Sequence, residues 1–410
     1  MKKQLLTLAI CLSTISSFAA DLYVNGSGLP NTYATLQAAI DAASDGDNIY
    51  VSATETHNGP VTVDKSVYII SDQSGSKFQL VGDIIVGNNI EQVTIVGANG
   101  ISVSSQNTAS SRVQVNLISS SISELSITHN NYKVNIYDCF VGGTATFRNG
   151  VVIGSELSRI SIGNESSVEV DTIKIIANEF EYLSSSNQIH SIEIKNNFVN
   201  KLDNYRESGL NFSSMPSSLN KYAIISNNTI EYYAYQNRDY GYSESAGIYF
   251  SSTPSKFSGL TIVNNYIHNV SGQSSTSSPG NWTSNGFAIY VSSTFPNVYI
   301  ANNRWYAGYT TNISYYTTNH YLVDNTYGSS SYSTSNGNLS SGNYSNLGLD
   351  QAPYYDIDGS RNDIGNSGGP HAWSQYHTSG GKAVIVDLEI PSQIYLGTSL
   401  SIKAKGVHKN

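Results

Sequence analysis

Charged side chains that could do acid–base chemistry gather in two stretches of the chain, residues 201–207 and 231–244. They are Asp203, Arg206, Glu207, Glu231, Arg238, Asp239 and Glu244. Hydrolysis of a glycosidic bond needs two carboxyl groups placed around that bond. Elimination instead needs a base for the proton beside a carboxylate, together with a cation that neutralises the carboxylate. These residues are therefore the candidate catalytic residues of a polysaccharide hydrolase or lyase.

Aromatic residues accompany these charged groups. The candidates for substrate binding are Tyr205, Tyr233, Tyr235, Tyr240, Tyr242, Trp282 and Trp305. Aromatic rings stack on the apolar faces of sugars, and charged groups bind hydroxyls or uronates, so this mixture predicts a polysaccharide as the partner. The alternative is that the tyrosines only cover loops and that the Arg–Asp pairs are solvated.

A repeating sequence frame marks the elements that must position these residues. It consists of an apolar residue, a spacer, Asn, often a second Asn, and a bulky residue, as in Ile-Val-Asn-Asn-Tyr over residues 262–266. Its polar residue recurs at Asp138, Ser155, Asn178, Asn196, Asn227, Asn264, Asn302 and Asn325. The shortest spacings, 17 and 18 residues, indicate a short repeating unit. We expect each Asn to adopt a left-handed turn conformation and to stack its amide in a ladder, which is a structural role.

The copies of the frame are stretched in one region. Between Asn196 and Asn302 the successive spacings grow to 31, 37 and 38 residues, so three consecutive coils carry insertions. Loops that leave adjacent coils of a solenoid lie on one side and can form a binding groove. The stretched region therefore predicts a site between residues 200 and 310.

Short strands fill most of the chain between residues 60 and 345. Examples are Val-Thr-Val at residues 61–63 and Val-Asn-Ile at residues 134–136, with Gly, Asn or Ser between the runs. Strands this short at such close spacing favour an all-β solenoid, in which each coil adds one strand to each sheet. Residues 35–43 have the pattern of an amphipathic helix with Asn31 or Thr32 as its N-cap, and residues 21–50 are expected to cap the N-terminal end.

The chain resembles the right-handed parallel β-helix proteins of the pectin-lyase-like class. The resemblance is carried by Thr-Leu-Gln-Ala-Ala-Ile at residues 35–40, Gly-Asp-Asn-Ile-Tyr-Val at residues 46–51 and the repeating frame, and it covers about residues 22–370. It implies a right-handed parallel β-helix with an N-terminal capping helix. Because that class contains lyases, hydrolases, adhesins and phage tailspikes, the resemblance says little about function.

No catalytic residue is carried over from that class. The polygalacturonase series (Asn-Thr-Asp, Asp-Asp, Gly-His-Gly, Arg-Ile-Lys) has no counterpart here, and neither does the Trp-Ile-Asp-His motif of calcium-dependent pectate lyases. We therefore keep a second class of function beside the enzyme: a non-catalytic adhesin or surface module that uses the β-helix as a spacer or a binding face.

A second recognisable stretch spans residues 356–370 and looks like the terminal motif of many secreted bacterial β-helix proteins. Asp356 and Asp358 alternate with Ser360 as in a calcium loop, and Asp363 follows. Arg361 stands where an EF-hand requires Gly, which excludes an EF-type site. We expect Asp358 or Asp363 to pair with Arg361, with calcium bound by Asp356, Asp358 and Asp363 as the alternative. The sequence indicates no other cofactor.

The two ends of the chain have different patterns from the middle. Residues 1–20 read as a cleaved signal peptide, with Lys2 and Lys3 before an apolar run. Residues 371–382 read as a linker. Residues 383–410 contain two strand-like runs that look like the opening of an immunoglobulin-like module, either truncated or docked elsewhere, because 28 residues cannot build a sandwich.

Composition limits the possible partners. The net charge of −9 argues against nucleic acid or an anionic lipid surface as partner. No stretch after the signal segment is long and apolar enough to insert into a membrane. Cys139 is the one cysteine after the signal segment and is expected to be a core residue. We expect a monomeric protein that is secreted or held at the cell surface.

Overall fold

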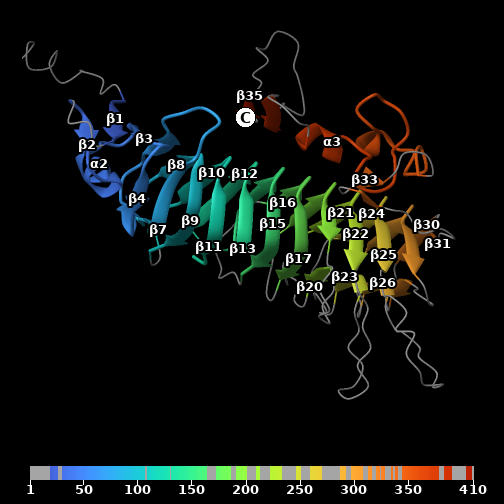
Figure 1. Ribbon diagram of the computed structural model, residues 1–410. Helices are drawn as coiled ribbons and strands as arrows, with labels where there is room; N and C mark the ends of the chain where they lie inside the picture. The colour runs from blue at the N-terminus through green and yellow to red at the C-terminus, as the bar shows by residue number, and fades with distance from the viewer. Residues whose placement is uncertain are drawn as a thin grey trace, which may run out of the picture.

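The computed structural model shows stacked coils that form one elongated body (Figure 1). The structure describes residues 19–25, 30–106, 109–129, 131–163, 172–185, 191–200, 209–212, 222–232, 246–250, 259–269, 287–291, 297–307, 313–315, 320–323, 325–327, 334–335, 338–339, 344–377, 383–389 and 403–408. The fold is all-β and consists mainly of two long parallel sheets, so the predicted parallel β-helix is confirmed.

The first sheet has 14 strands, all parallel to their neighbours. In order across the sheet they are β2 (Thr32–Tyr33), β1 (Asp21–Val24), β3 (Asn48–Val51), β6 (Tyr68–Ser71), β8 (Gln92–Val96), β10 (Val113–Ile118), β12 (Tyr132–Tyr137), β14 (Gly150–Ile153), β16 (Ile173–Ile176), β18 (Ile192–Lys195), β21 (Tyr222–Ser226), β24 (Gly259–Val263), β27 (Val298–Ala301) and β30 (His320–Val323). Each coil thus contributes one short strand to this sheet.

The second sheet is made of the strand that follows in each coil. It begins with β4 (Thr56–Asn58) and β5 (Val61–Val63) and continues through β7 (Phe78–Val86), β9 (Ala98–Ser105), β11 (Ser121–Ile127), β13 (Phe140–Phe147), β15 (Glu156–Ile162) and β17 (Glu179–Ser185). Register shifts interrupt the pairing of β7 with β9, of β9 with β11 and of β11 with β13. β-bulges of this kind bend a strand, so each of these long strands changes direction once and forms two arms of the coil.

From β19 onward each long strand is replaced by two short ones. The first arm of the sheet continues as β19 (Phe198–Asn200), β22 (Thr229–Tyr232), β25 (Tyr266–Asn269), β28 (Arg304–Ala307) and β31 (Thr326–Tyr327). The second arm continues as β20 (Leu210–Phe212), β23 (Ala246–Phe250), β26 (Phe287–Val291) and β29 (Ile313–Tyr315). β17 pairs with both β19 and β20, which shows that the two arms are halves of one earlier strand.

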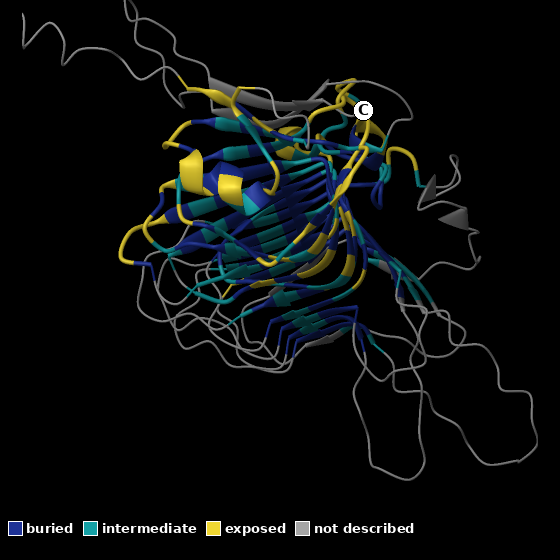
Figure 2. Cartoon of the chain, turned by 60° about the vertical axis from the view of Figure 1, so that its left-hand side comes forward, coloured by how far each residue is buried: buried dark blue, intermediate teal, exposed yellow. Residues whose placement is uncertain are grey.

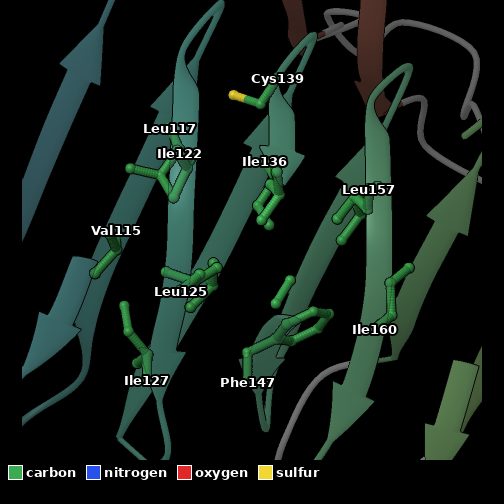
Figure 3. Close-up of a cluster of buried hydrophobic side chains, with 14 of the residues drawn as sticks. Val115, Leu117, Ile122, Leu125, Ile127, Ile136, Cys139, Phe147, Leu157 and Ile160 are labelled. Carbon is green, nitrogen blue, oxygen red and sulfur yellow. The ribbon is translucent and has the colours of Figure 1, made fainter. Parts of the chain in front are cut away.

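The core lies inside the coils and is built by period-two alternation. In β10, Val113, Val115 and Leu117 are buried while the residues between them are half-buried. Figure 2 shows that buried residues recur along the strands of the stacked coils. The inward side chains of both sheets meet in one continuous apolar cluster, of which Figure 3 draws a part. Burial of apolar surface drives this packing, at about 25 cal/mol per Å². Cys139 is a free, buried cysteine of this cluster, as expected.

The two roles predicted for the frame Asn are divided between two adjacent positions. The first position has the left-handed backbone, with φ of 51° at Asp138, 54° at Ala177 and 57° at Asn196. Asn227, Asn264 and Asn302 continue this turn ridge with φ of 57°, 57° and 52°. The residue after each of them carries the ladder. Our assignment of both roles to one Asn was therefore wrong.

The ladder runs through Asn178, Asn197, Asn228, Asn265, Asn303 and Asn325. Each Nδ2 donates to the Oδ1 of the next coil, at 3.1 Å for the first pair and 2.9 Å for the others. The same Oδ1 also accepts the backbone N–H of the preceding ladder residue. Ser155, Cys139 and Ser120 occupy this position in the earlier coils, and each accepts the backbone N–H of the coil before.

Residues 344–377, which we name the C-terminal strap, run back along the turn ridge. Asn302 Nδ2 donates to the carbonyl of Leu347, and Asn227 Nδ2 donates to Asn362 Oδ1 at 2.7 Å. Farther along the strap, His377 Nε2 contacts the carbonyl of Ala177 at 2.7 Å. The strap contains η1 (Ala352–Tyr354) and α3 (Trp373–Tyr376), and α3 lies along one edge of the stack (Figure 1).

The part of the expected linker that the structure describes, residues 371–377, is packed against the coils. Trp373 is 5% exposed, and its ring meets the ring of Phe198 edge-on. Tyr376 packs with Tyr137 and Ile153 in a small cluster outside the main core. Residues 378–382 lie outside the described part of the chain, and the role of residues 371–382 as a linker stays a prediction.

The predicted N-terminal helix is present as α2 (Leu36–Ala42). Its N-cap is Thr35, whose Oγ1 accepts the N–H of Ala38 at 3.2 Å, so the expected caps Asn31 and Thr32 were wrong. Thr35 stands directly before Leu36 with an extended backbone, so its hydroxyl reaches a free N–H group of the first helical turn. Asn31 and Thr32 lie too far before that turn to do so. The helix contacts β1, β2, β3 and β5. Its role as a cap over the core stays a prediction.

Two small antiparallel pairs complete the described structure. β32 (Thr334–Ser335) pairs with β33 (Asn338–Leu339), and β34 (Ala383–Glu389) pairs with β35 (Lys403–His408). The second pair contains the strand-like runs of residues 383–410, and its relation to an immunoglobulin-like module stays a prediction. Among the helices of the described residues, none is long and apolar enough to cross a membrane.

Candidate functional site

The ladder position sets the direction of the side chains that follow it on the first arm. Register pairs join Phe198, Thr229, Tyr266 and Arg304, which stand one residue after the ladder and face outward. Two residues after the ladder, Val199, Ile230, Ile267 and Trp305 face the core. Three residues after it, Asn200, Glu231, His268 and Tyr306 form a second outward column, which we name the polar column.

The polar column stands where the insertions leave the scaffold. The first arm ends at Asn200, Tyr232, Asn269 and Ala307 in successive coils, and the second arm resumes at Leu210, Ala246, Phe287 and Ile313. These ends are stacked in register, so all four intervening segments start at the same corner of the β-helix. Further residues also separate the second arm from the next strand of the first sheet, between Phe212 and Tyr222 and between Phe250 and Gly259, so a groove formed on one side stays a prediction.

Of the seven predicted catalytic residues, the structure describes Glu231. Its side chain is 9% exposed, and its Oε1 lies 3.8 Å from Nδ1 of His268, whose side chain is 12% exposed. At this distance the two side chains are not hydrogen-bonded to each other, but they place a carboxylate beside an imidazole on adjacent coils. Asp203, Arg206, Glu207, Arg238, Asp239 and Glu244 lie outside the described residues. Whether they converge on Glu231 stays a prediction.

Of the seven predicted aromatic contacts, the structure describes Trp305. Trp305 is half-buried and packs against the main core, because it stands two residues after Asn303 in the inward column. Its contact with a sugar stays a prediction. Tyr205, Tyr233, Tyr235, Tyr240, Tyr242 and Trp282 lie outside the described residues.

The sequence reasoning missed His268 and Tyr306 as members of a site. Their rings are 5.4 Å apart between centroids and are tilted by 53°. Each stands three residues after a ladder Asn, at Asn265 and Asn303. That constant offset was visible in the sequence and could have identified both residues together with Glu231.

The second arm presents outward rings on the other side of the corner. Tyr249 and Tyr290 are paired in register and stack with centroids 5.0 Å apart and planes 12° apart. Asn211 precedes Tyr249 in the same column, and its Nδ2 donates to the hydroxyl of Tyr182 at 3.2 Å. Hydroxyl and amide groups therefore border the corner from this side as well.

A hollow of 350 Å³ lies on the first arm just before the polar column. It is lined by Phe140, Glu156, Leu157, Ser158, Glu179, Phe180, Glu181 and Asn200. Phe140 and Glu156 also border a larger hollow of 580 Å³ that lies along the turn ridge between Gly97 and Gly154. Three carboxyl groups, a surface aromatic ring and an amide thus share one depression.

The three aspartates proposed for calcium each accept a hydrogen bond from a backbone N–H group of the strap. Asp356 Oδ1 accepts the backbone N–H of Gly369, and Asp363 Oδ1 accepts that of Asn346 at 2.7 Å. Asp358 Oδ1 accepts that of Ser360 at 2.9 Å. Burial, followed by the nearby charge of Asp363, raises the pKa of Asp356. Among the described residues, no group of three or more His, Cys, Asp or Glu side chains is arranged to hold a metal ion.

Arg361 does not pair with Asp358 or Asp363, contrary to our expectation. Its Nε donates to the carbonyl of Gly348 at 2.7 Å. The two carboxylates instead accept hydrogen bonds from backbone N–H groups of the strap. Such bonds are needed because the strap has few regular backbone hydrogen bonds of its own.

Comparison with known proteins adds no family. No protein-family model matches the chain. No curated protein matches it either.

Proposed function

We propose that this protein is exported and binds an extracellular polysaccharide along the corner of the β-helix from which the insertions leave. The observation that carries the proposal is the polar column. It places an amide, a carboxylate, an imidazole and a phenol on four successive coils, at Asn200, Glu231, His268 and Tyr306.

The spacing of the column suits a polymer. Adjacent strands lie about 4.8 Å apart, so a chain that runs along the β-helix axis meets one hydrogen-bonding group at every coil. A small ligand would use one or two of these groups, whereas a polysaccharide can use all of them. Tyr249 and Tyr290 add hydroxyl groups on the other side of the corner. Hydroxyl-rich ligands are recognised by such mixed polar and aromatic surfaces.

The test is a panel of soluble polysaccharides, with binding measured by affinity electrophoresis and calorimetry. The variants Glu231→Gln, His268→Ala and Tyr306→Ala should each weaken binding roughly tenfold, equivalent to about 1.4 kcal/mol. Tyr68→Ala is the matched control, because Tyr68 is a half-buried tyrosine on the outer face of the first sheet. It should leave affinity unchanged.

The competing function is a non-catalytic surface module that uses the β-helix as a spacer and binds no glycan. Failure of every polysaccharide in the panel to bind would favour that function and would overturn our proposal. Equal losses from Tyr68→Ala and Tyr306→Ala would also overturn it, because they would move binding away from the corner.

A further inference from the structure

The hollow before the polar column has an aromatic ring and two carboxyl groups on three successive coils. Phe140 pairs in register with Glu156, and Glu156 pairs in register with Glu179. Phe140 is 45% exposed, which is unusual for a large apolar side chain. A ring held open at the rim of a depression can pack against the apolar face of a sugar.

The spacing of the two carboxylates is set by the β-helix itself. Side chains paired in register on adjacent strands stand about 4.8 Å apart. Glycosidases that retain anomeric configuration hold their two carboxyl groups roughly 5–5.5 Å apart, whereas inverting enzymes need roughly 6.5–9.5 Å. Glu156 and Glu179 therefore start one strand spacing apart, which allows their carboxyl groups to reach the separation of the retaining reaction.

The surroundings of the two carboxyl groups differ. Glu156 is exposed, while Glu179 is half-buried. Burial, followed by the charge of Glu156, raises the pKa of Glu179. Two neighbouring carboxyl groups with different environments can take the two different roles of acid and nucleophile.

An amide joins this hollow to the polar column. Asn200 lines the hollow and pairs in register with Glu231. Its Oδ1 is buried and has no hydrogen-bond partner among the described residues. An unsatisfied acceptor at this place is costly for the folded protein, and a sugar hydroxyl would satisfy it. A polysaccharide on the column would continue into the hollow.

We propose that this hollow is a catalytic site that hydrolyses an uncharged polysaccharide with retention of configuration, with Glu156 as nucleophile and Glu179 as acid and base. This inference rests on the proposed polysaccharide binding. The three glutamates of the hollow, Glu156, Glu179 and Glu181, would repel a polyuronate, so the substrate class is an uncharged glycan.

The reaction balances in two steps. A carboxylate oxygen of Glu156 attacks the anomeric carbon, the glycosidic C–O bond breaks, and the carboxyl proton of Glu179 passes to the leaving oxygen. Water then gives a proton to Glu179 and attacks the same carbon, and the ester bond to Glu156 breaks. The products are two shorter glycans, and both side chains return to their starting forms.

The experiment uses the full chain with a panel of uncharged glucans, xylans, mannans and galactans. Binding and new reducing ends are measured in the same samples, and NMR records the anomer of the first product. The expected product has the configuration of the substrate. The expected loss of kcat is at least roughly a hundredfold in Glu156→Gln and in Glu179→Gln. Glu124→Gln is the control, because Glu124 is an exposed glutamate of β11 that does not line the hollow, and it should change kcat less than threefold.

Each outcome decides between the two proposals. Binding without new reducing ends would overturn the catalytic inference and leave the proposed binding intact. Absence of binding to every glycan would overturn both. A product of inverted configuration, or an equal loss in Glu124→Gln, would reject the roles given to Glu156 and Glu179. Thermal melting of each variant shows whether a loss of activity reflects unfolding.

Discussion

The substitution Asn228→Leu should destabilise the protein strongly, because Asn228 stands in the middle of the ladder. Its Nδ2 donates to Asn265 Oδ1 and to the carbonyl of Ile194, both at 2.9 Å, and to that of Ser226 at 3.1 Å. Its Oδ1 accepts the backbone N–H of Asn197 at 3.0 Å and Asn197 Nδ2 at 2.9 Å. Leucine has the same branched shape and the same number of side-chain heavy atoms but can make none of these bonds.

The magnitude follows from what the substitution leaves behind. The backbone N–H of Asn197 becomes a buried donor without its partner, which costs about 1–3 kcal/mol. Asn197 Nδ2 keeps the carbonyls of Ile175 and Lys195 as acceptors, so its loss is partial. With the remaining bonds at about 0.5–1 kcal/mol each, the total loss is about 3–5 kcal/mol.

Equilibrium unfolding in urea, followed by circular dichroism, measures this loss. Asn48→Leu is the matched control, because Asn48 makes an exposed side-chain bond to Asp21 and should change stability by less than about 0.5 kcal/mol. If Asn228→Leu lay within 1 kcal/mol of the parent chain, or equalled the control, the ladder would not stabilise the coils as argued. An unchanged m-value is needed for the comparison.

Three further predictions concern the strap and the core. Burial, followed by the charge of Lys195, lowers the pKa of His371 to about 4 from the ordinary 6.5, and Glu193, Lys174 and Tyr376 also face it. The unfolded chain therefore binds a proton that the folded chain does not, so stability should fall by up to about 3 kcal/mol between pH 6.5 and pH 4 and then level off. If the stability of His371→Gln fell by the same amount over this pH range, His371 would not be the cause. Trp373→Ala should cost about 3–5 kcal/mol and open residues 344–377 to limited proteolysis before the coils are cut, whereas Tyr355→Ala should not. Burial raises the pKa of the Cys139 thiol to about 12, so iodoacetamide should leave the folded chain unlabelled at mildly alkaline pH and label it in urea; rapid labelling of the folded chain would show that the thiol is not buried.

The fold could be predicted from the sequence because every coil repeats the same pattern of a short apolar strand followed by a turn. Each copy of the frame combines an inward apolar strand with a turn, and the number of copies made a solenoid the economical interpretation. The same repetition hid the fact that the left-handed backbone and the amide ladder belong to two adjacent residues of the turn. Where two asparagines are adjacent, as at Asn264 and Asn265, composition cannot tell which one has the left-handed backbone. Ala177 shows that the ridge position also accepts a residue with no amide.

The candidate site was harder to predict. The insertions contain many charged and aromatic residues, whereas single polar residues on the strands have no such compositional signal. His268 and Tyr306 were missed because their constant offset from the ladder was not applied, although the sequence shows it. The hollow around Glu156 and Glu179 lies in coils without long insertions, where nothing in the sequence separates an outward carboxylate on a strand from an ordinary solvated one. It becomes visible when register places the two side chains on neighbouring coils.

The strap also has a consequence for the order in which the molecule is assembled. Its hydrogen bonds join residues far apart in the chain, 135 positions for Asn227 with Asn362 and 200 for Ala177 with His377. Contacts of such sequence separation form late, because the ends of a long loop must first be brought together. The strap also needs several finished coils as its template. During synthesis the ridge between Ala177 and Asn302 is therefore bare until residues 344–377 have been made, and the sheets, the core and the ladder must keep the coils in register without the strap during that interval.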